Sequence, residues 1–208
     1  MESEKLDNKD LERVKTFTDA VFAIALTILV LDLRLPEGTN FESVAALKNS
    51  LITMMPKFLA FILSAILIGG NWISVMNLQS AIAKVNLFFV ADLVIYLTII
   101  SLIPFCCNLI GNYPTNPFSF VAFGIVCELL AINAYFFIRQ CRRTKLFHAT
   151  TNFKEVKKLE SSILFIILLL LGLMILAFYS TKLAFILFLV YNFIPFFITQ
   201  RLNKTANK

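Results

Sequence analysis

Long apolar runs separated by short polar segments form the main pattern of this chain. Six runs approach the length of about 20 residues that crosses a bilayer, and none alternates strictly as a half-buried strand does. The pattern predicts an all-α membrane protein, a single bundle of six transmembrane helices over residues 1–208. The predicted helices cover residues 16–35, 58–78, 87–110, 118–138, 161–179 and 183–199.

The segments between these helices differ in character. Pro36, Glu37 and Gly38 are expected to end the first helix, and the amphipathic residues 39–55 that follow predict a short interfacial helix or a covering loop. The connection between the fourth and fifth predicted helices includes a long, strongly basic stretch, residues 139–158. In the simplest interpretation its Lys and Arg residues set the orientation of the chain in the membrane. Such a segment can also contact anionic lipid headgroups.

Composition supports the membrane assignment and the distribution of charge predicts the orientation. The chain is 59% hydrophobic and 15% charged, with a mean hydropathy of +0.81, whereas soluble domains carry about 25% charged residues. Of the 19 Lys and Arg residues, 15 fall on the side of the two termini when six helices are threaded through the bilayer. Both termini are therefore expected to be cytoplasmic. The net charge of +6 is explained by this asymmetry and does not indicate nucleic-acid binding.

Residues typical of catalysis or metal binding are sparse. His148 is the single histidine, and neither a nucleophile–base set nor a nucleotide-binding loop is present. The four cysteines show no metal-ligand spacing, so no enzyme activity, cofactor or metal site is expected. Asp92 and Glu128 lie within predicted helices and would be the titrating groups of a proton-coupled carrier.

The first predicted helix contains an unusual polar residue near its beginning. Asp19 is costly in lipid and therefore marks a polar site, which we expect to be satisfied from the second helix by Asn71, Trp72 or Asn77. At 100° per residue, Ile24 lies about 140° from Asp19, in an apolar stripe on the helix. This stripe includes Phe17, Ile24, Thr27, Ile28 and Leu31. Spacing alone favours ordinary core packing for the stripe.

Residues 13–19, R-V-K-T-F-T-D, resemble the R-x-x-x-F-S-D signature of the transmembrane protein 175 family of potassium channels. The resemblance continues through residues 20–36, and Trp72, the segment 102–105 and the turn 111–114 also fit. Two differences stand out. Thr18 replaces the usual Ser, and Val75 and Met76 occupy positions where many members carry His.

The resemblance implies a homotetrameric, potassium-permeable cation channel in the cell (inner) membrane, with four copies of the first helix around the pore. It places Ile24 at a hydrophobic constriction and Thr27, Ile28 and Leu31 on the next pore-facing turns. The signature residues Arg13, Phe17, Thr18, Asp19 and Trp72 would hold that helix against its neighbours.

Ion selection by such a pore would differ from that of a carbonyl-lined filter. No TVGYG loop is present, so potassium selectivity would be modest and would follow from dehydration cost. Spacing alone also allows Arg13 to face the inner mouth of the pore, and this alternative stays open.

A rival hypothesis is a small proton-coupled transporter or a non-conducting membrane scaffold. Transporters typically contain broken helices or inverted repeats, and neither is evident along the sequence. Beyond the bilayer and other copies of the chain, no soluble protein or nucleic-acid partner is expected.

Overall fold

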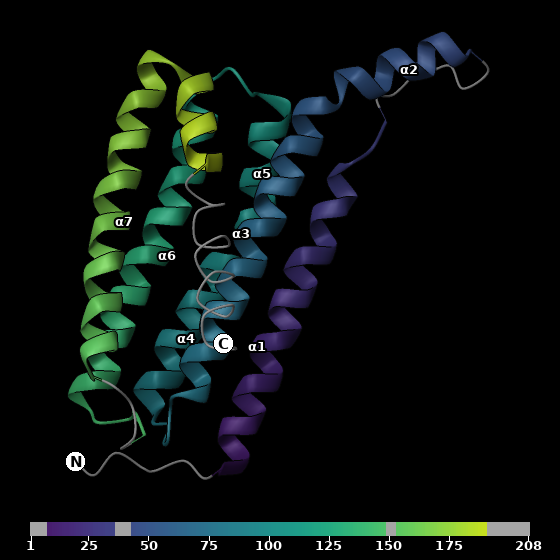
Figure 1. The fold of residues 1–208 in the computed structure, drawn as a ribbon. Helices are drawn as coiled ribbons and strands as arrows, with labels where there is room; N and C mark the ends of the chain where they lie inside the picture. The colour runs from purple at the N-terminus through teal and green to yellow at the C-terminus, as the bar shows by residue number, and fades with distance from the viewer. Residues whose placement is uncertain (1–7, 36–42, 149–152, 191–208) are drawn as a thin grey trace, which may run out of the picture.

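The computed structural model describes residues 8–35, 43–148 and 153–190, and this part of the chain is a bundle of α-helices (Figure 1). Five spans are long and apolar enough to cross a membrane. They are built from α1 (Asn8–Leu29) with the short 3-10 helix η1 (Val30–Asp32), α3 (Met55–Ser80), α4 (Leu87–Ile100) with α5 (Ile103–Asn112), α6 (Pro117–Arg143) and α7 (Phe153–Tyr179).

The sixth predicted helix is only partly within the described residues. An apolar helix covers Thr181–Val190, and residues 191–199 of the predicted helix 183–199 lie outside the described part. The all-α membrane class is therefore confirmed, while the count of six spanning helices stays a prediction.

The third span is interrupted, whereas a continuous helix over residues 87–110 was expected. α4 ends at Ile100 and α5 begins at Ile103, with Pro104 in the first turn of α5. Proline lacks a backbone N–H and its ring clashes with the carbonyl four residues earlier, so a helix cannot continue undisturbed through it. The apolar run conceals this break, because hydropathy responds to burial in lipid and not to backbone continuity.

Several helices extend beyond their predicted apolar cores. α1 begins eight residues before the predicted start at Thr16, α6 continues to Arg143, and α7 begins at Phe153. Much of the basic connection is therefore helical, because polar residues continue a helix into the aqueous boundary at little cost. Hydropathy locates the part of a helix that lies in lipid and not its whole length.

The amphipathic segment between the first two spans contains a short helix, as predicted. α2 (Val44–Thr53) is capped by Ser43, whose side chain accepts a hydrogen bond from the Ala46 N–H at 3.3 Å. No residue of α2 is buried, and the helix projects away from the bundle (Figure 1). The first helix ends earlier than the predicted residue 35: α1 ends at Leu29, η1 at Asp32, and residues 33–35 are not helical, while Pro36, Glu37 and Gly38 lie outside the described residues.

Helix packing places α1 at one side of the bundle, where it contacts α3, α4 and α5, while α6 joins α4 to α7 (Figure 1). Two connections meet at the end that holds the start of α1. There the Ala83 N–H donates to the Leu146 carbonyl at 2.8 Å, and the His148 N–H donates to the Ala81 carbonyl at 3.0 Å. These bonds place the second and fourth connections at the same end of the bundle, and the orientation of that end in the membrane stays a prediction.

Candidate functional site

The first helix has a buried face that fixes it to the bundle. Thr18, Phe22, Ala25 and Leu29 are buried, with Thr18 only 1% exposed. Their spacing of three and four residues forms one stripe of an α-helix. This stripe holds α1 against the other helices, chiefly α3.

The opposite face of α1 carries the predicted pore-lining residues and is exposed. Ile24 is 57% exposed, Ile28 43% and Leu31 55%, and Thr27 is exposed as well. Ordinary core packing within one bundle, which spacing alone favoured, is therefore wrong for this stripe. An apolar helix face that the described residues leave open can meet lipid or another copy of the chain.

Thr27 is the polar residue among these four. Its hydroxyl donates to the Ile24 carbonyl at 2.9 Å. Because the proton is used in this bond, the oxygen presents its remaining lone-pair density outward as an acceptor. A ring of such oxygens would suit a cation better than an anion.

Two side-chain hydrogen bonds join the middle of α1 to α3. The Trp72 indole Nε1 donates to Asp19 Oδ1 at 2.8 Å, which confirms the expectation that the second membrane helix supplies a donor to this carboxylate. Nearby, Gln79 Nε2 donates to Thr18 Oγ1 at 3.1 Å, and the Thr18 hydroxyl itself donates to the Val14 carbonyl at 2.8 Å. These bonds fix both the rotation and the height of α1.

Gln79 was missed in the sequence, although a signal was present. It lies seven residues after Trp72, which places both side chains on one face of α3. Asn71, a proposed partner of Asp19, is instead bonded elsewhere. Its Oδ1 accepts from the Tyr96 hydroxyl of α4 at 2.5 Å. The contact ties α3 to α4 behind the first helix.

Two residues of the signature lie apart from this network within the single chain. Arg13 and Phe17 are both exposed on α1, and Phe17 lies on the same side as Ile24. Arg13 makes no ion pair or hydrogen bond with the described side chains. Its assignment to a structural network or to an inner mouth stays a prediction.

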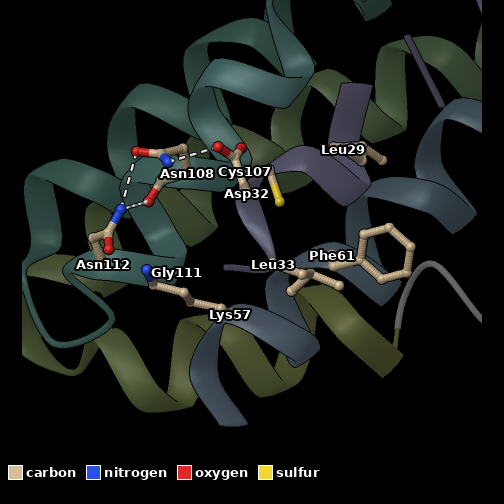
Figure 2. A pocket seen from close by; sticks show the side chains of 9 residues that line it. All are labelled: Leu29, Asp32, Leu33, Lys57, Phe61, Cys107, Asn108, Gly111 and Asn112. Carbon is tan, nitrogen blue, oxygen red and sulfur yellow. Dashed lines mark hydrogen bonds between the residues drawn. The ribbon is translucent and has the colours of Figure 1, made fainter. Parts of the chain in front are cut away.

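The C-terminal end of the first span, in η1, has a separate polar attachment (Figure 2). Asn108 Nδ2 of α5 donates to Asp32 Oδ1 at 2.9 Å, and Asn112 Nδ2 donates to Asn108 Oδ1 at 3.0 Å. A cavity of about 10 Å³ adjoins these groups, beside Lys57 and Cys107. That volume is close to the minimum needed for a single water molecule.

The two other membrane carboxylates lie at different places. Glu128 is buried in α6, and its Oε2 has no hydrogen-bond partner in the described part of the chain. Asp92 of α4 lines an open recess with residues near the end of α6. No group of three or more metal-ligating side chains gathers among the described residues.

Comparisons with known proteins give a consistent result. A family model described as endosomal/lysosomal potassium channel TMEM175 matches residues 13–104. A protein of Chamaesiphon minutus named as a potassium channel is 29% identical over 133 residues, 64% of this chain and 65% of the relative. One from Chryseobacterium, also named as a potassium channel, is 32% identical over 121 residues, 57% of this chain and 59% of the relative. The match thus spans less than two thirds of either relative.

The fold also resembles a solved structure. The crystal structure of a lysosomal potassium-selective channel TMEM175 homolog from Chamaesiphon minutus matches with a TM-score of 0.73 and 26% identity. The match covers 89% of this chain and 99% of that one.

Proposed function

The chain belongs to the TMEM175 family, and from this premise we propose that it forms a potassium-permeable cation channel with modest selectivity over sodium. The channel is a homotetramer in the cell (inner) membrane with both termini cytoplasmic. The exposed apolar stripe on α1 carries this proposal, because it leaves one face of a membrane helix uncovered by the described part of the chain. One copy supplies one such helix, so a pore on this plan needs several copies around an axis.

Conduction in this arrangement depends on an apolar constriction. Four copies of Ile24 form the narrowest ring, followed by rings of Thr27, Ile28 and Leu31. A narrow ring of this kind blocks by dewetting and conducts when it widens or becomes hydrated. Selection of potassium then follows from its lower dehydration cost, and the outward Thr27 oxygens offer the polar ligands.

The polar contacts of α1 explain why the stripe faces away from its own bundle. The bonds from Trp72 to Asp19 and from Gln79 to Thr18 hold the opposite side of the helix against α3. Rotation of α1 would break both bonds and would expose Thr18. Thr18, Asp19 and Trp72 therefore act as positioning residues for the ring.

Potassium flux from liposomes that contain the purified full chain tests the proposal. Ile24→Asn hydrates the ring, so we expect flux to rise, by about tenfold for each 1.4 kcal/mol removed from the barrier. Ile175→Asn is the matched control, because Ile175 is a similarly exposed isoleucine on α7. Absence of flux from the parent protein, or equal effects of the two substitutions, would contradict the pore assignment.

A further inference from the structure

An open recess of about 390 Å³ lies between α4 and the end of α6. Asp92 lines it from α4, and the other lining residues, Phe136, Arg139, Gln140 and Arg143, come from α6. Their spacing of three, four and seven residues places these α6 side chains on one helix face. The recess thus combines two guanidinium groups, one amide, one carboxylate and one aromatic ring.

The length of α6 locates this recess at the membrane boundary. α6 has 27 residues and is about 40 Å long, whereas the hydrocarbon core is about 30 Å thick and takes about 20 residues. About 20 residues counted from Pro117 end near Phe136, which is 62% exposed. Arg139 and Arg143 therefore lie at the depth of the headgroup phosphates, with their apolar stems against the bilayer.

The charges of the recess do not neutralise one another by direct contact. No ion pair within 4.0 Å joins Asp92 to either arginine, and Arg139 uses Nη1 to donate to the Tyr135 hydroxyl at 3.1 Å. The remaining guanidinium donors face a recess whose formal charge is positive. Planar guanidinium groups are well suited to binding phosphate oxygens.

We propose that this recess binds the phosphate of an anionic glycerophospholipid between Arg139 and Arg143, with an acyl chain along Phe136. Asp92 lies deeper in the recess, where its negative charge repels the anion. This repulsion weakens the binding, so that the lipid can exchange. A lipid is the occupant because the recess opens where the apolar part of α6 ends. The site is independent of whether the chain conducts ions.

Native mass spectrometry of the full chain in non-ionic detergent, titrated with phosphatidylglycerol, tests this proposal. The double variant Arg139→Gln/Arg143→Gln is expected to bind about tenfold or more weakly, since hydrogen bonds between charged groups are lost. Asp92→Asn is expected to bind more tightly, because the opposing charge is gone. The control Lys48→Gln/Lys182→Gln removes two exposed positive charges elsewhere and should bind as the parent does.

Two further measurements define the ligand. Phosphatidylcholine with the same acyl chains should bind more weakly than phosphatidylglycerol, and millimolar inorganic phosphate should not displace the lipid. Displacement by inorganic phosphate would assign the recess to a free anion and overturn the lipid proposal. Unchanged phosphatidylglycerol affinity in the double arginine variant, or unchanged affinity in Asp92→Asn, would also overturn it.

Discussion

The buried bond between Thr18 and Gln79 allows a quantitative test of how α1 is held. Thr18 is 1% exposed and Gln79 4%, with 3.1 Å between Gln79 Nε2 and Thr18 Oγ1. Thr18→Val keeps the side-chain shape but removes the acceptor, which leaves a buried amide N–H without this partner. We expect a loss of about 1–3 kcal/mol in the free energy of unfolding.

Two further variants separate the hydrogen bond from packing. Thr18→Ser keeps the oxygen and removes one methyl group, so about 0.8 kcal/mol or slightly more should be lost. In the double variant Thr18→Val/Gln79→Leu both polar partners are gone, and replacing both partners is less costly than leaving one unpaired. The double variant should therefore be more stable than the sum of the two single changes, by about 0.5–3 kcal/mol.

Unfolding of the purified chain in mixed micelles of increasing denaturing detergent measures these differences. Trp72 is the single tryptophan and contacts α1 through Asp19, so its fluorescence reports on the α1–α3 contact. If Thr18→Val were as stable as the parent, or if the double variant showed simple additivity, the bond would not be what fixes α1.

Two other polar contacts lead to predictions of different size. Trp72→Phe removes the donor to Asp19, and because both side chains are partly exposed the free energy of unfolding, followed by circular dichroism since this variant lacks tryptophan, should fall by less than about 1 kcal/mol. Potassium flux should nevertheless change, since the position of α1 along α3 is less well defined. Flux equal to that of the parent protein would argue against a positioning role for Trp72. Glu160→Gln disrupts the bidentate pair with Arg142, whose N–O distances are 2.9 and 3.0 Å. Its cost should be about 1–3 kcal/mol in the same unfolding assay, and a variant of unchanged stability would show that the pair does not fasten α6 to α7.

The sequence was sufficient to predict features that depend on local composition. Apolar runs indicated the membrane class, and residues 13–36 indicated the family that the comparisons support. A hydrogen-bond donor for Asp19 was also predictable, because a carboxylate in a membrane helix requires one and α3 carries an indole at a suitable position.

Features that depend on how helices meet were not predictable. Gln79 reaches Thr18 only because α1 and α3 pack closely at that height. The recess beside Asp92 arises from two helices more than forty residues apart in the sequence. The roles of Ile24 and its neighbours also stay a prediction, because they depend on contacts between copies of the chain and one copy contains none of them.

The break before Pro104 gives the two ends of the first helix unequal supports. Its N-terminal half is held by α3, a helix of 26 residues, through Trp72 and Gln79. Its C-terminal end is held through Asn108 by α5, a helix of 10 residues that follows the interruption. Backbone hydrogen bonds continue on either side of the interruption, from the Ser101 N–H to the Leu97 carbonyl at 3.0 Å and from the Cys106 N–H to the Leu102 carbonyl at 3.2 Å, but α4 and α5 do not form one unbroken helix. The two ends of the first span therefore depend on different parts of the bundle: Thr18 and Asp19 on one long continuous helix, and Asp32 on a short helix that begins at the proline break.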